Sequence, residues 1–288
     1  MARSLSRRSF LKVMAGSGIA LSATSVMGYT IYGEPGWLDL THVAVPVRNL
    51  PAALHGLTIA QLSDLHSGAM VSPAHIANAI ALTTDQSPDL IVLTGDYVTQ
   101  GADYIARSAD ALATLQAPLG TYAVLGNHDH SSGAPDRIMR VLESAGMVVL
   151  RNDHRRITVG TSAIWRAGVD DALKSHADIA RAFRDAPEHD LRLLLAHEPD
   201  IADVAAGYGV HLQLSGHSHG GQIRLPLVGP ISLPELAQRY PIGLQRVVGS
   251  TTWVYTNRGV GVTNLPVRFN CRPEVTILQL QRVTGTAG

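Results

Sequence analysis

Three short sequences rich in histidine, aspartate and asparagine supply the residue types of a metal site. They are Asp64-x-His66, Gly126-Asn127-His128-Asp129 and Gly216-His217-Ser218-His219. Imidazole, carboxylate and amide groups are N/O ligands suited to zinc, manganese or iron. Two adjacent ions of this kind promote displacement at phosphorus, and one remaining histidine would be free for acid chemistry. The pattern therefore predicts a phosphoester-cleaving site.

Apolar runs typical of buried strands precede five ligand-bearing segments. The runs are Leu57–Leu62, Leu90–Thr94, Tyr122–Leu125, Leu191–Ala196 and Leu212–Leu214. They lead, in this order, to Asp64 and His66, to Asp96, to Asn127, His128 and Asp129, to His197, and to His217 and His219. Because the carboxyl ends of strands line the ligand crevice of open α/β sheets, we expect these side chains to converge.

Strands and helices alternate in the first half of the chain, and strands predominate in the second half. Further strands are expected at His42–Val47, Met147–Leu150, Ile157–Val159, Ala163–Ala167, Trp253–Thr256 and Glu274–Gln281. Helices are expected at Pro73–Asp85, Asp103–Leu115, Pro135–Ala145, His176–Arg184 and Pro199–Ala206. This order predicts an α/β fold, a two-sheet β-sandwich flanked by helices. With no internal repeat or low-complexity linker, residues 33–288 are expected to form one domain.

Residues 1–32 have the layout of an export signal or an N-terminal anchor. Residues 6–12 read Ser-Arg-Arg-Ser-Phe-Leu-Lys, and an uncharged run follows from Val13 to Gly33. The arginine pair resembles a twin-arginine signal, which implies the twin-arginine export machinery as a partner. We expect a location in the periplasm or cell wall, or at the outer face of the inner membrane. The sequence leaves cleavage and anchoring open.

The composition favours a folded protein with a sizeable core. Apolar residues make up 45 % of the chain, charged residues make up 16 %, and the formal net charge is zero. A neutral chain without interleaved basic and aromatic residues argues against a nucleic-acid partner. Cys271 is the only cysteine, so an intramolecular disulfide and a thiolate metal site are both excluded.

The complete set of motifs resembles the calcineurin-like metallophosphoesterases. Its members are Asp64-x-His66, Gly95-Asp96, Gly126-Asn127-His128-Asp129, His197 and Gly216-His217-x-His219, all in the order of that family. Three further segments resemble its exported or membrane-associated bacterial phosphodiesterase branch: Gly220-Gly221-Gln222, Asn257-Arg258-Gly259 and Leu265–Phe269. The resemblance spans about residues 40–281 and implies the metallo-dependent phosphatase fold.

The resemblance also implies residue roles. Asp64, His66 and His219 would hold one metal, Asn127, His197 and His217 would hold a second, and Asp96 would bridge the two. The metals would be Mn, Zn or Fe, and a hydroxide between them would attack phosphorus in line. His128 would protonate the leaving oxygen or stabilise the transition state, and Asp129 would orient His128 through a hydrogen bond.

Other polar residues leave alternatives open. Arg258 and Arg268 are candidates for binding the substrate phosphate, and a surface ion pair is an equal alternative. His130 is a candidate support for the site. The remaining histidines lack partners at ligand spacing and are expected to be structural or on the surface; they are His42, His55, His75, His154, His176, His189 and His211.

The proline-rich, apolar segment Leu225–Leu244 also has more than one interpretation. It could form a wall of the substrate site, touch a membrane, or fold back over the second sheet. The substrate would be a phosphorylated small molecule, an envelope polymer or a nucleotide-linked lipid, cleaved as a monoester, a diester or a pyrophosphate. A non-catalytic metal-binding scaffold is the alternative, although the complete ligand set argues against it.

Overall fold

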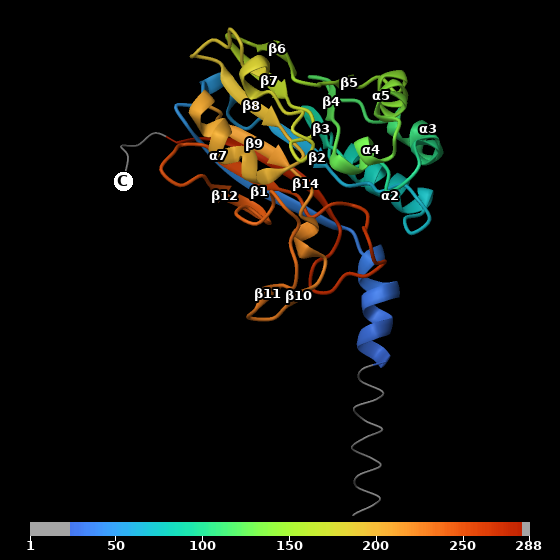
Figure 1. Cartoon of the computed structure of the whole chain (residues 1–288). Helices are drawn as coiled ribbons and strands as arrows, with labels where there is room; N and C mark the ends of the chain where they lie inside the picture. The colour runs from blue at the N-terminus through green and yellow to red at the C-terminus, as the bar shows by residue number, and fades with distance from the viewer. Residues whose placement is uncertain (1–23, 284–288) are drawn as a thin grey trace, which may run out of the picture.

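Two six-stranded sheets pack face to face, and helices cover their outer faces, as Figure 1 shows. The computed structural model describes residues 24–283. The first sheet has the strand order β1-β14-β2-β3-β4-β5, and the second has the order β12-β13-β9-β8-β7-β6. The predicted α/β class, a two-sheet β-sandwich flanked by helices, is confirmed.

The elements have the following bounds. The first sheet contains β1 (Asp39–Arg48), β2 (Thr58–Leu62), β3 (Leu90–Thr94), β4 (Thr121–Val124), β5 (Val148–Val149) and β14 (Glu274–Val283). The second contains β6 (Asp153–Val159), β7 (Ser162–Gly168), β8 (Leu191–Leu195), β9 (Leu212–Ser215), β12 (Gly243–Arg246) and β13 (Trp253–Thr256). The hairpin β10 (Arg224–Leu225) and β11 (Gly229–Pro230) forms a separate sheet. From residue 39 to residue 283 the α-helices are α2 (Pro73–Thr84), α3 (Ala109–Leu112), α4 (Asn127–Ser131), α5 (Pro135–Ser144), α6 (Ile179–Ala182) and α7 (Ala202–Ala205).

Strand β3 shows how one apolar run serves two cores. Leu90 and Val92 pack between the two sheets, whereas Ile91 and Leu93 pack toward the helices. Successive side chains of a strand point to opposite faces, so a strand that is covered on both sides must be apolar throughout. The residues after such a strand are therefore held on a rigid support.

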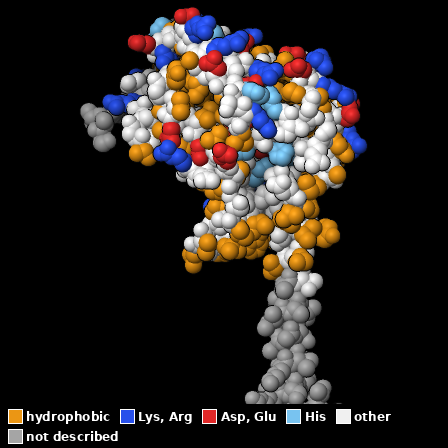
Figure 2. Space-filling model, viewed as in Figure 1, with side chains coloured by type: hydrophobic (Ala, Val, Ile, Leu, Met, Phe, Trp, Pro, Cys, Tyr) orange, Lys and Arg blue, Asp and Glu red, His pale blue; other side chains and the backbone are white. Residues whose placement is uncertain are grey.

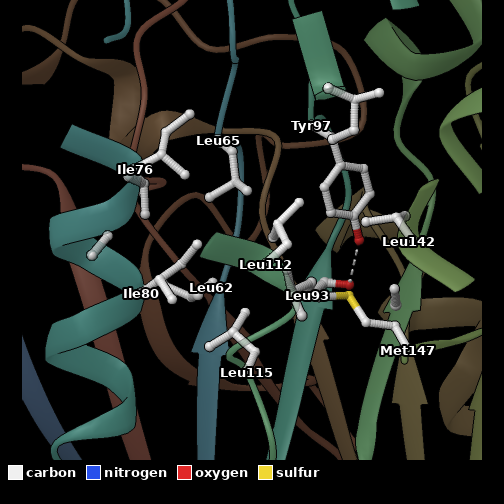
Figure 3. Close-up of a cluster of buried hydrophobic side chains, with 14 of the residues drawn as sticks. Leu62, Leu65, Ile76, Ile80, Leu93, Tyr97, Leu112, Leu115, Leu142 and Met147 are labelled. Carbon is white, nitrogen blue, oxygen red and sulfur yellow. Dashed lines mark hydrogen bonds between the residues drawn. The ribbon is translucent and has the colours of Figure 1, made fainter. Parts of the chain in front are cut away.

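Helix α2 covers the outer face of the first sheet. Ser72 caps its start by accepting a hydrogen bond from the backbone N–H of His75, and Pro73 occupies the first turn. Its buried residues include Ile76 and Ile80, one turn apart, on the face that meets the sheet. Figure 3 shows both side chains in the cluster that contains Leu62 and Leu93.

Several helices are shorter than the sequence predicts. The region predicted as a helix over Asp103–Leu115 divides into a 3₁₀ segment, Ala102–Ser108, and the short α3. Helix α6 begins only after Asp178, because that side chain accepts a hydrogen bond from the N–H of Arg181 and caps the helix there. The hairpin β10–β11, strand β12 and helix α4 have no counterpart among the elements predicted from the sequence.

The N-terminal part of the described chain projects from the end of the domain that also carries the β10–β11 hairpin (Figure 1). It includes the π-helical segment Tyr29–Gly33 and the 3₁₀ segment Glu34–Gly36. Among residues 24–283, no helix is long and apolar enough to cross a membrane. The arginine pair at positions 7 and 8 lies outside the described residues, so the twin-arginine signal stays a prediction.

Candidate metal centre

The ends of four strands bring six of the seven predicted metal ligands into two adjacent clusters. One cluster contains Asp64, His66 and His219, and the other contains Asp96, His197 and His217. All six side chains are buried. They follow β2, β3, β8 and β9, while Asn127 and His128 follow β4 at the start of α4. Because β2 and β3 belong to the first sheet and β8 and β9 to the second, ligands from both sheets meet at one edge of the sandwich.

The first cluster has the dimensions of a single metal site. Nε2 of His66 lies 3.0 Å from Nε2 of His219. Oδ1 of Asp64 lies 3.2 Å from Nε2 of His219 and 3.8 Å from Nε2 of His66. Ligand atoms around a tetrahedral ion with bonds of ~2.0–2.1 Å are about 3.3 Å apart. The three atoms therefore fit one metal ion without rearrangement of the chain.

Backbone carbonyl groups orient the two histidines of the second cluster. Nδ1 of His197 donates to the carbonyl oxygen of Thr94 at 2.6 Å, which leaves the lone pair on Nε2. Nε2 of His217 donates to the carbonyl oxygen of Glu235 at 2.9 Å, which leaves the lone pair on Nδ1. Such hydrogen bonds fix the tautomer and ring orientation of a metal-binding histidine.

Two buried atoms of the second cluster have no hydrogen-bond partner in the described part of the chain. They are Nε2 of His197 and Oδ1 of Asn127. Nε2 of His197 also lies only 3.1 Å from Oδ2 of Asp96. This contact requires a positive charge at or between the two atoms, and buried polar atoms are rarely left unpaired. A metal ion satisfies both requirements, and the N/O donor set is suited to one.

The electrostatic environment keeps other ligands in the form that binds metal. Burial lowers the pKa of His66 to about 3 and that of His217 to about 4. Both rings are therefore neutral at pH 7 and can offer a lone pair. At His197 burial acts in the same direction, but the Asp96 carboxylate outweighs it and holds the pKa well above its usual value. The Asp96 carboxylate thus favours a positive charge at His197, and a bound metal cation would supply that charge.

Asp96 occupies the position between the clusters. Its Oδ2 atom lies 3.6 Å from Nε2 of His66 in the first cluster and 3.1 Å from Nε2 of His197 in the second. Its Oδ1 atom accepts a hydrogen bond of 2.8 Å from the backbone N–H of His128. One carboxylate oxygen thus faces both clusters, as the predicted bridging role requires.

The loops reach this arrangement through an unusual backbone conformation. Asp64, His66, Asp96, His217 and His219 all have positive φ angles, between 46° and 68°. This left-handed region is uncommon for residues other than glycine, and such outliers cluster at functional sites. The surrounding packing holds the strained residues in place. A Cβ atom on Gly216, for example, would lie 1.9 Å from Oγ of Ser63 and 2.2 Å from Oδ2 of Asp64.

His128 lines the hollow and is a member of neither cluster. Nδ1 of His128 is 3.2 Å from the carbonyl oxygen of Thr99, which can only accept a hydrogen bond. Nδ1 therefore carries the proton, and Nε2 is left free. The ring contacts that of His66 edge-on, with 5.0 Å between the ring centroids. A protonated His128 at this position can donate from Nε2 to a group bound in the hollow.

Asp129 does not make the hydrogen bond to His128 that the sequence analysis expected. Its Oδ2 atom accepts from the backbone N–H groups of Asp96 and Gly126, each at 2.9 Å. Its Oδ1 atom accepts from the N–H groups of Tyr97 at 2.9 Å and Val98 at 3.3 Å. The carboxylate of Asp129 thus fixes the loop after β3, which carries Asp96. It binds backbone N–H groups and does not bind the ring of His128.

The structure does not place the two candidate phosphate-binding arginines in the hollow at the metal clusters, although Nη2 of Arg268 lies 3.5 Å from Nδ1 of His219. Arg258 pairs with Glu274 at 3.0 Å and with Asp39 at 3.4 Å. Arg268 is fully buried and donates to the carbonyl oxygens of Cys271, Arg258, Gly259 and Gly261. Arg258 therefore forms an ion pair, whereas Arg268 ties the loop after β13 together. Neither guanidinium lines the hollow at the metal clusters.

His130 has a partner away from the ligands. Its Nε2 atom lies 2.6 Å from Oδ1 of Asp170, and Arg151 binds the other oxygen of that carboxylate at 2.5 Å. His176, which was expected to lack partners, lies beside this pair, with its ring centroid 5.1 Å from that of His130. The three groups are close enough to hold a metal. Because Arg151 already neutralises the Asp170 carboxylate, this cluster is explained as a group of ion pairs and does not require a metal ion.

A hollow of about 340 Å³ opens onto the clusters. Asp96, Asn127, His128, His217 and His219 form its floor. Its walls come from segments that the ligand motifs do not include, and they contain Leu173, Gln222, Ser232, Pro234, Thr263 and Asn264. The segment after His219 thus lines the site, one of the alternatives left open by the sequence. No motif identified Leu173 or the carbonyl groups of Thr94, Thr99 and Glu235, because neither an isolated leucine nor a backbone atom has a residue signature.

Comparison with known proteins agrees with this geometry. Residues 57–221 match the family described as calcineurin-like phosphoesterase. The chain is 37 % identical over 290 residues to the Phosphodiesterase YaeI of Escherichia coli (strain K12), with 96 % of this chain and 99 % of that protein covered. It is 34 % identical over 284 residues to the metallophosphoesterase YkuE of Bacillus subtilis (strain 168), with 97 % and 99 % covered.

A vertebrate relative is similar over a smaller share of its own length. The chain is 29 % identical over 277 residues to a Danio rerio protein named Transmembrane protein with metallophosphoesterase domain. The alignment covers 92 % of this chain and 62 % of the Danio rerio protein. The similarity therefore includes nearly all of the fold described above.

Proposed function

The chain belongs to the calcineurin-like phosphoesterase family and is a metal-dependent phosphoesterase, and we propose that it hydrolyses phosphodiester or pyrophosphate bonds with two metal ions at the cell envelope. The observation that carries this proposal is the position of Asp96, whose Oδ2 atom faces ligand nitrogens of both clusters at 3.6 Å and 3.1 Å. A carboxylate between two ligand sets is the arrangement of a paired metal centre. Mn, Zn and Fe all suit the donor set.

The residues of the chain have separate tasks in this mechanism. Asp64, His66 and His219 would hold one ion, Asn127, His197 and His217 would hold the other, and Asp96, whose Oδ2 atom faces both ligand sets, would contribute its carboxylate to the centre. Such ions supply Lewis acidity toward the phosphoryl oxygens. With two divalent cations and the two carboxylates of Asp64 and Asp96, the centre carries a charge of about +2, which favours an anionic substrate.

His128 performs the proton transfer. Its Nδ1–H group is held by the carbonyl oxygen of Thr99, so the ring presents Nε2 to the hollow. When protonated, Nε2 donates to the leaving oxygen of the phosphoester. Asp129 acts indirectly, because its four backbone hydrogen bonds hold the loop from which Asp96 extends.

The envelope location rests on the N-terminal sequence. Residues 6–12 fit a twin-arginine signal, and the uncharged run from Val13 to Gly33 suits an export signal or an anchor. The name of the Danio rerio relative places a metallophosphoesterase domain in a transmembrane protein. Export in a folded state also suits a metal enzyme with a single cysteine.

Hydrolysis of two chromogenic esters by the purified full chain tests the function. The chain is stripped of metal with a chelator, and Mn, Zn or Fe is added back before bis-p-nitrophenyl phosphate or p-nitrophenyl phosphate. Metal-restored cleavage that favours the diester is the expected result, and His128→Ala is the control with an intact metal site. Metal binding without cleavage of either ester would instead support a non-catalytic scaffold.

A further inference from the structure

Exposed apolar side chains gather at the end of the domain from which the N-terminal segment projects, as Figure 2 shows. In the hairpin, Leu227, Val228 and Ile231 are 108 %, 76 % and 62 % exposed. Soluble surfaces expose single apolar residues, but a contiguous group marks a contact surface. We call this group the apolar rim; it consists of Leu225, Leu227, Val228, Ile231, Leu265 and the N-terminal residues Val26, Met27 and Tyr32.

The three parts of the rim are fixed to one another through the loop that precedes β14. The backbone N–H of Arg268 donates to the carbonyl oxygen of Thr30 at 3.0 Å. Cys271 donates its N–H to the buried side chain of Glu34. The N–H of Arg224, at the start of the hairpin, donates to the carbonyl oxygen of Phe269 at 2.9 Å. The rim is therefore a built surface rather than three independent loops.

The charges around the rim fit a lipid bilayer better than water or a protein groove. Residues 223–234 contain one charged residue, Arg224, and residues 259–273 contain only arginines among charged types. Within these two segments no carboxylate opposes contact with a bilayer, and the partly exposed Arg224 and Arg272 can attract anionic lipid headgroups. Tyr32 and Trp37 are exposed beside the rim, and Tyr and Trp favour the membrane interface.

The direction of the chain points to the same occupant. The described chain starts at Thr24 on the projecting segment, and the uncharged run Val13–Gly33 leads into it. If that run enters a bilayer, the rim is the part of the domain that meets the bilayer surface. A second copy of the chain would also cover the apolar side chains. Contact with a second copy, however, would not explain why the uncharged N-terminal run leads to the same end of the domain.

The rim adjoins the mouth of the hollow above the metal clusters. Ser232, next to Ile231, and Asn264, next to Leu265, both line the hollow. We propose that the apolar rim seats on a lipid bilayer and that the hollow receives a phosphoester whose other part carries acyl chains in that bilayer. The substrate class rests on the proposed function, whereas the membrane contact stands on the rim alone.

Site-specific fluorescence tests the contact without any activity measurement. The full chain carries a nitrobenzoxadiazole label on Leu227→Cys, with Val248→Cys as the matched control; the native Cys271 is buried. Val248 is 84 % exposed and lines a surface with Arg48, at the opposite end of β1 from Asp39. With phosphatidylethanolamine–phosphatidylglycerol vesicles, spin-labelled lipids should quench the label at position 227 at least threefold more than at 248.

Equal quenching at the two positions, with the chain bound to vesicles, would overturn the membrane contact. If the label at position 227 is shielded from water in the absence of vesicles and the chain sediments as a dimer, the occupant of the rim is a second copy of the chain and the membrane contact is overturned. Either result leaves the proposed phosphoesterase function standing, because neither measurement involves catalysis.

Paired substrates with the same leaving group test the substrate class. Hexadecyl p-nitrophenyl phosphate in vesicles and water-soluble methyl p-nitrophenyl phosphate are compared at equal metal loading. The wild-type chain should favour the hexadecyl ester by at least tenfold in kcat/KM. The double variant Leu227→Glu/Val228→Glu should lose this preference and keep its rate on the methyl ester, whereas Val248→Glu should change neither. No preference in the wild-type chain refutes the substrate class, and no cleavage of either ester refutes the proposed phosphodiesterase activity.

Discussion

Replacing Gly216 by alanine should damage the first metal cluster through steric overlap alone. The new Cβ atom would lie 1.9 Å from Oγ of Ser63 and 2.2 Å from Oδ2 of Asp64. These two oxygens are themselves joined by a hydrogen bond of 2.5 Å. Since ordinary Cβ contacts are not shorter than 3.0 Å, Asp64 must move by roughly 1 Å, a distance that removes a ligand from its position.

The size of the effect follows from two contributions. Forcing a methyl group into a packed interior costs ~1–3 kcal/mol, and loss of the charge-assisted bond between Ser63 and Asp64 costs ~1.5–3 kcal/mol. We expect Gly216→Ala to lower the free energy of unfolding of the metal-free protein by about 3–5 kcal/mol. In the metal-loaded protein, one of the two ions should be lost, because only the first cluster contains Asp64.

Urea unfolding of the metal-free chain and elemental analysis after reloading measure the two effects separately. Gly207→Ala is the matched control, because a Cβ atom at Gly207 meets nothing within 4 Å. At that position alanine should be neutral or stabilise by ~0.4–1 kcal/mol. A Gly216→Ala protein with wild-type stability and two bound ions would refute the reasoning, since the side chains around Asp64 would then be free to adjust.

Three further changes separate the roles of neighbouring residues. His128→Ala should retain both metals and reduce turnover by ~10²–10⁴-fold, measured by elemental analysis and steady-state kinetics; loss of metal would make His128 a ligand. Asp96→Asn should lower metal content and thermal stability together, because bound metal adds to the free energy of folding; unchanged metal content would remove Asp96 from the bridging position. His130→Gln should destabilise the fold by about 1 kcal/mol at pH 5.5 and by less at pH 9. The pKa of His130 is raised mainly by its hydrogen bond to Asp170, and the pKa of Asp170 is lowered to about 2. The ion pair between His130 and Asp170 therefore stabilises the fold fully between about pH 4 and 6.5, and this stabilisation is lost as pH rises through the pKa of His130. Equal losses of unfolding free energy at pH 5.5 and pH 9, measured by urea unfolding, would contradict this.

Local sequence determined the strands and the residue types at their ends. The run Leu90–Thr94 coincides with β3, because an uninterrupted apolar run followed by Gly95-Asp96 allows few alternatives. In each ligand motif the spacing of one or two residues places side chains on one short loop. Residue type and position within the strand–loop unit are local properties, so they could be predicted without knowledge of the fold.

Contacts between segments far apart in the chain were decided only by the tertiary structure. Asp129 was expected to hold the ring next to it, but the backbone N–H groups of a loop more than thirty residues earlier surround its carboxylate. Arg268 was a candidate for phosphate binding, but four carbonyl oxygens take its hydrogen bonds inside the protein. A backbone carbonyl or N–H has the same chemistry at every residue, so these partners leave no trace in the sequence.

The apolar rim shows the same division between sequence and structure. The sequence contains the apolar hairpin, Leu265 and the uncharged N-terminal run as separate segments, and each has a structural interpretation of its own. Only folding brings them to one end of the domain, through hydrogen bonds of Arg268, Cys271 and Arg224 that span up to 238 residues. Residue type determined what each segment could contact, while chain topology decided that they would do so together, beside the metal ligands.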